Sequence, residues 1–300
     1  MKRSIIGAAV LFFASLSGLA SAAPVTSASL SGGNAVWTIG QNGALGLNVI
    51  DANLGGQTDA FDNALAFQVG GFAYSSGANF DLSGQTVTGN MASIAGLNVF
   101  VQYYADASSP TLRTLITLSN TGAGSVSTTV RLQNNVGSDS ATRTIATSSG
   151  DTAFTAADRW IITDDDNGSG GDPANTHVLW GSNGQAPANV GLTVFSASGT
   201  QGVLADFALD IAAGTTESLM FFNQLYTSGS AAQAGVVGFN DLTSTNPLLA
   251  GLSPAQLSQI QNWEFEAQAV PEPSVIALMG LGLAGLRLSR RTSKSGRRAA

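Results

Sequence analysis

Leu219-Met220-Phe221-Phe222 is the stretch that decides the fold of this chain. All four side chains are apolar, so the segment has no polar face. Successive side chains of a β-strand point to opposite faces of the sheet, so a strand with this sequence must be buried on both sides. We therefore expect residues 217–226 to form a central strand of a layered β-structure.

Two other segments alternate between apolar and polar residues with a period of two. This pattern is typical of antiparallel strands that have one face in a core and the other in solvent. In the first segment Leu112, Ile116 and Leu118 fall on one face of the predicted strand, and Arg113 and Thr117 fall on the other. In the second, Val130 and Leu132 fall on one face, and Arg131 and Gln133 fall on the other.

Short apolar or alternating runs separated by Gly, Asn, Asp and Ser clusters recur along residues 23–269, a pattern that predicts many short strands. We therefore predict one all-β body, a large antiparallel β-sandwich with one or two short helices; a division into two domains near 148–150 is the alternative. Short helices are expected at 254–261, where Ser253-Pro254 supplies an N-cap and a first-turn proline, and at 231–237. Strands are predicted at 36–39, 45–50, 65–69, 86–91, 97–104, 112–118, 128–134, 160–163, 177–180, 191–195, 203–209 and 217–226, with a closing strand at 263–266.

The charge of this body restricts its partners. It contains four arginines, no lysine and eighteen acidic residues, which gives a formal net charge of −14. So acidic a surface excludes nucleic-acid binding through phosphate contacts, and it attracts divalent cations. The chain has no cysteine, which excludes disulfides and thiolate metal sites, and its single histidine, His177, leaves little basis for a zinc site.

The N-terminus has the pattern of a signal peptide at residues 1–22. Lys2 and Arg3 precede an apolar run at 5–16, and Ala20-Ser21-Ala22 supplies small residues at the two positions that signal peptidase reads. We expect cleavage after Ala22. The apolar run is short for a membrane-spanning helix, which requires roughly 20 residues.

The C-terminus, residues 270–300, combines three features. Pro271-Glu272-Pro273 is followed by an apolar run at 275–286 and then by a basic cluster that begins with Arg287, Arg290 and Arg291. The two prolines favour an extended, accessible backbone. The apolar run predicts a transmembrane helix, and the flanking arginines are expected to stay on the cytoplasmic side.

This order of features resembles the sorting signal of PEP-CTERM proteins. The resemblance covers about a tenth of the chain, and it implies that an exosortase-type enzyme recognises Pro271, Glu272 and Pro273. It also implies export through the inner membrane, transient anchoring there, and delivery to the cell surface or to an extracellular matrix rich in exopolysaccharide. A polysaccharide is therefore an expected partner.

The densest polar cluster predicts a calcium site. Asp164, Asp165, Asp166 and Asp172 surround a glycine-rich loop, and hard cations prefer several oxygen ligands on such loops. The spacing is not that of an EF-hand, because Gly168 stands where a fifth-position ligand is needed. The alternative is an acidic, solvated loop between strands.

Three runs between residues 135 and 160 resemble runs in exported bacterial β-sandwich proteins of unknown function. They are Asn135-Val136-Gly137-Ser138-Asp139, Ser148-Ser149-Gly150-Asp151 and Asp158-Arg159-Trp160. The resemblance implies one coherent module over about 112–180, and it implies no activity. We expect Asp158 and Arg159 to form a structural ion pair.

No catalytic constellation is evident, and we predict that the protein is not an enzyme. His177 lies in a predicted strand, no G-x-S-x-G elbow is present, and the sequence cannot pair two carboxylates across a cleft. We therefore expect a non-catalytic structural role after sorting. A glycan-binding module, supported by calcium and by stacking on Tyr103, Tyr104, Trp160 or Trp180, is the first alternative, and a secreted carbohydrate-active enzyme is the second.

Overall fold

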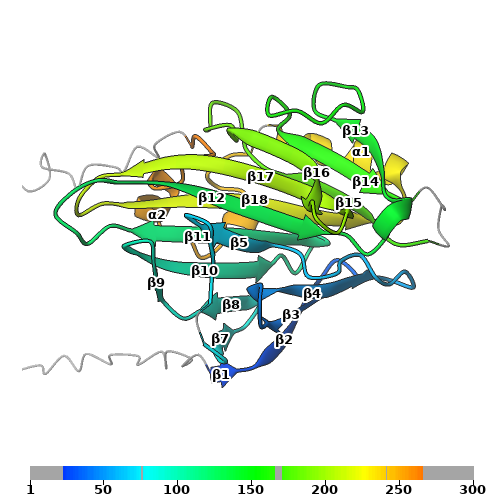
Figure 1. The fold of residues 1–300 in the computed structure, drawn as a ribbon. Helices are drawn as coiled ribbons and strands as arrows, with labels where there is room; N and C mark the ends of the chain where they lie inside the picture. The colour runs from blue at the N-terminus through cyan, green and yellow to red at the C-terminus, as the bar shows by residue number, and fades with distance from the viewer. Residues whose placement is uncertain (1–22, 76, 166–170, 241, 266–300) are drawn as a thin grey trace, which may run out of the picture.

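The computed structural model describes residues 23–75, 77–165, 171–240 and 242–265. It is an antiparallel β-structure in layers, as predicted (Figure 1). The largest sheet has ten strands. In spatial order these are β1 (Ala23–Val25), β7 (Phe80–Ser83), β8 (Thr86–Gly89), β10 (Leu97–Ala105), β11 (Thr111–Ser119), β18 (Thr216–Tyr226), β15 (Ala174–Val178), β14 (Trp160–Asp164) and β13 (Arg143–Thr147), and β9 (Ala92–Ile94) also pairs with β10.

Two smaller sheets and a set of short helices complete the body. The five-stranded sheet runs β16 (Asn189–Phe195), β17 (Thr200–Ile211), β12 (Val126–Asn135), β5 (Ala66–Val69) and β6 (Phe72–Ala73). The three-stranded sheet runs β2 (Ser27–Gly32), β3 (Ala35–Asn42) and β4 (Gly46–Leu54). The helices are η1 (Asp139–Ala141), α1 (Gly229–Gly235), η3 (Val236–Phe239), η4 (Pro247–Leu249) and α2 (Pro254–Ser258).

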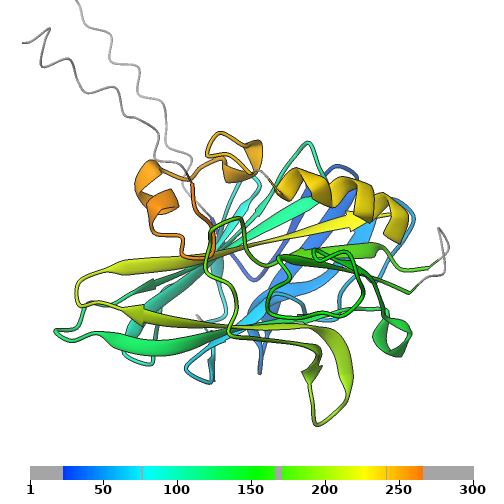
Figure 2. The same ribbon diagram turned by 90° about the horizontal axis from the view of Figure 1, so that it is seen from above.

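Strand β18 lies in the middle of the ten-stranded sheet and is buried on both faces, as its sequence predicted. Leu219 and Phe221 belong to the core shared with the five-stranded sheet. Met220 and Phe222 belong to a second core, formed with the helices that follow β18. Figure 2 shows α1, η3, η4 and α2, drawn in yellow and orange, together on one side of the ten-stranded sheet, with β12 and β17 on the other. We call residues 227–263, which contain these four helices, the helical layer.

The helical layer corrects one prediction. Strand β11 was expected to expose Arg113 and Thr117 to solvent, but these side chains are 1% and 6% exposed. Residues far along the chain cover this face of the strand: Arg113 donates hydrogen bonds to the carbonyl oxygens of Leu248 and Ala250. Burial lowers the pKa of Arg113 to about 10.

Most of the predicted strands are confirmed. The helix predicted at 231–237 overlaps α1 and η3, and the helix predicted at 254–261 overlaps α2. The predicted strand at 177–180 begins earlier in the structure, at Ala174. The closing strand at 263–266 is wrong for its described residues, 263–265, which form no strand. Trp263 instead packs edge-on against Phe222. The polar or very short strands β1, β2, β6, β7, β9 and β13 have too weak a pattern to be predicted.

Asn262 fastens the end of the helical layer to the central strand. Its amide oxygen accepts a hydrogen bond of 2.8 Å from the Met220 backbone nitrogen, and its amide nitrogen donates bonds of 2.7 Å to the carbonyl oxygens of Met220 and Leu179. The side chain is fully buried. It therefore satisfies three backbone groups that no water can reach.

We predict that Asn262→Ala lowers the free energy of unfolding by about 2–3 kcal/mol, because it leaves the Met220 backbone nitrogen and the Leu179 carbonyl oxygen unpaired, while the Met220 carbonyl oxygen keeps its bond from the Trp263 indole nitrogen. Urea denaturation followed by circular dichroism measures the change. Gln261→Ala is the matched control, since its amide nitrogen bonds only to the nearby Gln259 carbonyl. Equal effects of the two substitutions would show that Asn262 is not a fastening point.

Candidate functional site

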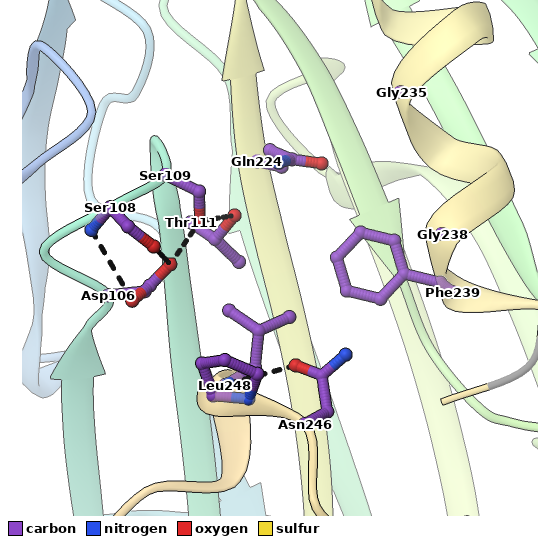
Figure 3. A pocket seen from close by; sticks show the side chains of 11 residues that line it. Asp106, Ser108, Ser109, Thr111, Gln224, Gly235, Gly238, Phe239, Asn246 and Leu248 are labelled. Atoms are coloured by element: carbon purple, nitrogen blue, oxygen red, sulfur yellow. Dashed lines mark hydrogen bonds between the residues drawn. The ribbon is translucent and has the colours of Figure 1, made fainter. Parts of the chain in front are cut away.

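A pocket of about 220 Å³ lies between the ten-stranded sheet and the helical layer (Figure 3). The turn that joins β10 to β11 supplies Asp106, Ser108 and Ser109, and strands β11 and β18 supply Thr111 and Gln224. The opposite wall comes from the end of α1, from η3, and from η4 with the residue that precedes it. It consists of Gly235, Gly238, Phe239, Asn246, Pro247 and Leu248.

Asp106 is the centre of the polar wall. Its side chain is 7% exposed, and its Oδ2 atom accepts hydrogen bonds of 2.8 Å and 2.6 Å from the hydroxyls of Ser108 and Ser109. A longer bond of 3.4 Å joins the Ser108 backbone nitrogen to Oδ1. These donors fix the carboxylate in place and leave Oδ1 with acceptor capacity for a ligand.

Two glycines of the neighbouring hairpin lie directly against the turn that carries Asp106. Gly32 and Gly33 close the β2–β3 hairpin, and a side chain at Gly32 would collide with the backbone of Asp106. Gly33 has a φ of +54°, the left-handed region that glycine adopts without strain. The two residues therefore allow the hairpin to pack directly against the site.

The rest of the pocket offers a donor and an apolar surface. Gln224 uses its amide oxygen to accept a 2.6 Å hydrogen bond from the Tyr226 hydroxyl, which directs the amide nitrogen away from that bond. In the described part of the chain that nitrogen has no hydrogen-bond partner. Phe239 and Leu248 supply the apolar side opposite. The arrangement suits a small, uncharged ligand with hydroxyl groups and one apolar face.

Arg113 holds the wall that comes from the helical layer. Its Nη1 atom donates bonds of 2.8 Å and 3.0 Å to the carbonyl oxygens of Leu248 and Ala250, and its Nη2 atom donates to the Gln102 side chain. Its guanidinium lies 4.7 Å from the centre of the Tyr104 ring. Arg113 itself does not line the pocket, so it positions Leu248 rather than a ligand.

The structure describes only part of the acidic loop for which a calcium site was predicted, because residues 166–170 lie outside the described ranges. Asp166 lies outside the described residues, as do the sorting residues Pro271, Glu272 and Pro273, the arginines at 287, 290 and 291, and Ala20 and Ala22. Asp164 accepts a hydrogen bond from the Gly229 backbone nitrogen. Asp165 accepts one of 3.4 Å from the backbone nitrogen of Asp172. Among the described residues no three acidic or histidine side chains are grouped closely enough to hold a metal, so the calcium site stays a prediction.

Asp158 and Arg159 do not pair with each other, which corrects that expectation. Asp158 accepts hydrogen bonds from the backbone nitrogens and hydroxyls of Ser149 and Thr155. Burial raises its pKa, but these bonds outweigh burial and leave the pKa below its ordinary value. Arg159 donates instead to Asn240. Among the described residues Arg131 and Asp206 form the ion pair, at 2.7 Å.

His177 and the aromatic side chains proposed for stacking lie elsewhere. His177 is fully buried, with Nδ1 within 3.0 Å of the amide nitrogens of Asn134 and Asn223, and Nε2 at 3.0 Å from the Thr163 hydroxyl. Burial lowers its pKa to about 3, so it is neutral. Tyr103, Tyr104, Trp160 and Trp180 do not line the pocket. Phe239 does, and no local pattern in the sequence distinguished it from a core residue.

The C-terminal signal matches a known sorting motif. Residues 269–291 match the PEP-CTERM protein-sorting motif. The motif indicates an exported protein that is anchored at the membrane and processed by an exosortase. No helix within the described ranges is both long enough and apolar enough to cross a bilayer. No curated protein matches the chain in sequence.

Several solved structures align with about two thirds of this chain. A protein of Synechocystis sp. PCC 6803 has 11% identity and a TM-score of 0.42, and covers 67% of this chain and 96% of its own. A galactose mutarotase related enzyme of Lactobacillus acidophilus has 8% identity and a TM-score of 0.40, and the alignment covers 67% of this chain and 97% of that enzyme. A galactose mutarotase-like protein of Lactobacillus casei has 9% identity and a TM-score of 0.43, and the alignment covers 67% of this chain and 100% of that protein.

These likenesses contradict the prediction that the protein is not an enzyme, since one of the similar structures is named as an enzyme and another as mutarotase-like. We therefore withdraw that prediction. The likeness gives this chain neither a substrate nor a reaction.

Asp172 allows a test of the acidic loop. Burial and the neighbouring Asp165, Asp59, Asp139 and Asp164 raise its pKa to about 6. A pKa above the ordinary value means that this group favours the folded state at low pH, and that this stability is lost as the pH rises through about 6.

In a chelating buffer at pH 7 we expect Asp172→Asn to stabilise the body by up to about 1 kcal/mol once solvent screening is included, and to have no such effect at pH 4. Thermal denaturation measures both. If calcium binds, added CaCl₂ raises the melting temperature of the wild type but not that of the variant. An unchanged wild-type melting temperature would contradict the calcium prediction.

Proposed function

We propose that the protein is exported, held in the inner membrane by residues 275–286, processed at Pro271-Glu272-Pro273, and delivered to the cell surface or extracellular matrix. The motif match at 269–291 supports this route. The signal-peptide pattern that ends at Ala20 and Ala22 agrees with it, because both signals place residues 23–269 on the outer side of the membrane.

Peptide mass spectrometry of the membrane and matrix fractions of the producing cells tests this route. We expect the matrix form to begin at Ala23 and to end near Pro271–Pro273. Replacing all three residues of the motif with alanine should leave the full chain to Ala300 in the membrane fraction, while Ser274→Ala should be processed normally. An intact tail on the wild-type matrix form would contradict the proposal.

We further propose that the body binds a sugar unit in the pocket between Asp106 and Phe239. The observation that carries this proposal is the pairing of a fixed carboxylate and a free amide donor with an aromatic side chain across a small cavity. Sugar hydroxyls donate to carboxylates and accept from amides, and the C–H face of the ring packs on aromatic surfaces. The volume of about 220 Å³ suits one ring rather than a drug-sized ligand.

Gln224→Met tests this site, because it removes the amide donor while keeping the length of the side chain. We expect titration calorimetry with glucose, galactose and mannose to detect binding of at least one of them to the wild type, and about a tenfold weaker affinity for the variant, the cost of about one hydrogen bond. Gln233→Met is the matched control, since Gln233 is exposed and does not line the pocket. Binding that Gln224→Met leaves unchanged would place the sugar elsewhere.

A further inference from the structure

Charge is distributed very unevenly over the body. Of its eighteen acidic residues only Asp241, which lies outside the described residues, falls within the helical layer. The chain has no lysine or arginine between Arg159 and Arg287. Every exposed residue described in the layer is uncharged: Thr227, Ser230, Gln233, Ala234, Val237, Gly238, Thr243, Thr245, Pro247, Ala250, Gly251, Ser253, Pro254, Ala255 and Ser258.

The chain leaves the body from this same layer. Asn262 and Trp263 fasten it to Met220, through the amide contacts described above and a 2.8 Å bond from the Trp263 indole nitrogen to the Met220 carbonyl. Phe265 is the last described residue, and nine residues separate it from the apolar run that starts at Val275. Even fully extended, such a segment spans at most about 35 Å. The anchored tail therefore keeps the exit point of the body near the bilayer.

Electrostatics decides which face turns toward the bilayer. A surface that carries anionic lipids repels acidic side chains within a Debye length of about 8 Å. Seventeen of the eighteen acidic residues of a body whose net charge is −14 lie outside the helical layer, whereas the exposed residues described in that layer have no charge to be repelled. Val237, 60% exposed in η3, adds apolar area on that side.

We infer that the helical layer is a membrane-contact face, on which the body rests against lipid head groups while its tail is anchored. The inference depends on the proposed anchoring and adds an orientation to it. The five-stranded sheet then points away from the membrane, because it lies on the opposite side of the ten-stranded sheet. The contact is made by small uncharged side chains and needs no insertion of the layer into the hydrocarbon.

Energy transfer from single labels to the bilayer tests this orientation. The chain has no cysteine, so one introduced thiol takes one fluorophore. A255C places it on α2 in the helical layer. A208C is the matched control, because Ala208 is exposed on β17 of the five-stranded sheet. Both are made in the full chain, which is reconstituted in phosphatidylethanolamine–phosphatidylglycerol vesicles that carry an acceptor dye on the lipid head group.

We expect several-fold more efficient transfer from A255C than from A208C, and we expect Val237→Glu to reduce the A255C signal in these anionic vesicles. Equal transfer from the two sites would overturn the orientation. Flotation of the vesicles separates this failure from that of the anchor. A chain that floats but shows equal transfer refutes the contact face alone, whereas a chain that does not float refutes the proposed anchoring and the contact face with it.

Discussion

The burial of β18 on both faces is the constraint on which the rest of the structure depends. Leu219 and Phe221 require the five-stranded sheet on one side, and Met220 and Phe222 require the helical layer on the other. Without cysteines, the body depends on these two cores for its stability. The helices of the layer are too short to be stable alone, and the apolar face of the ten-stranded sheet holds them in place.

This layering creates the candidate site. The helical layer covers one face of β11 and β18. It thereby brings Phe239 and Leu248, which follow β18 in the chain, opposite Asp106, which precedes β11. The cover also buries Arg113, whose charge is compensated by backbone carbonyls rather than by a carboxylate. A buried cation held in this way is tolerated because Nη1 donates to two carbonyl oxygens of the segment that it fixes and Nη2 donates to Gln102, although the buried Nε has no hydrogen-bond partner.

Separation of charge connects the fold with the route that the protein follows. Eight of the twelve basic residues lie in the two terminal signals, where on the proposed route they orient the chain in the membrane, and eighteen of the nineteen acidic residues lie on the body. The helical layer carries neither charge on its described surface. The basic terminal signals, the acidic body and the uncharged described surface of the helical layer each fit one step of the proposed route, in which the exported protein is held beside a bilayer before its release.

The sequence by itself determined the β class, the double burial of residues 219–222 and the sorting signal, because these depend on side-chain period or on contiguous residues. It did not determine the burial of Arg113, since that depends on a segment more than a hundred residues away, nor the partners of Asp158, which are Ser149 and Thr155 rather than the adjacent Arg159. The pocket was likewise invisible, because Asp106, Gln224 and Phe239 come from three separate segments. Only the tertiary structure decided these, since a polar residue in a strand pattern has the same appearance whether solvent or another layer lies beyond it.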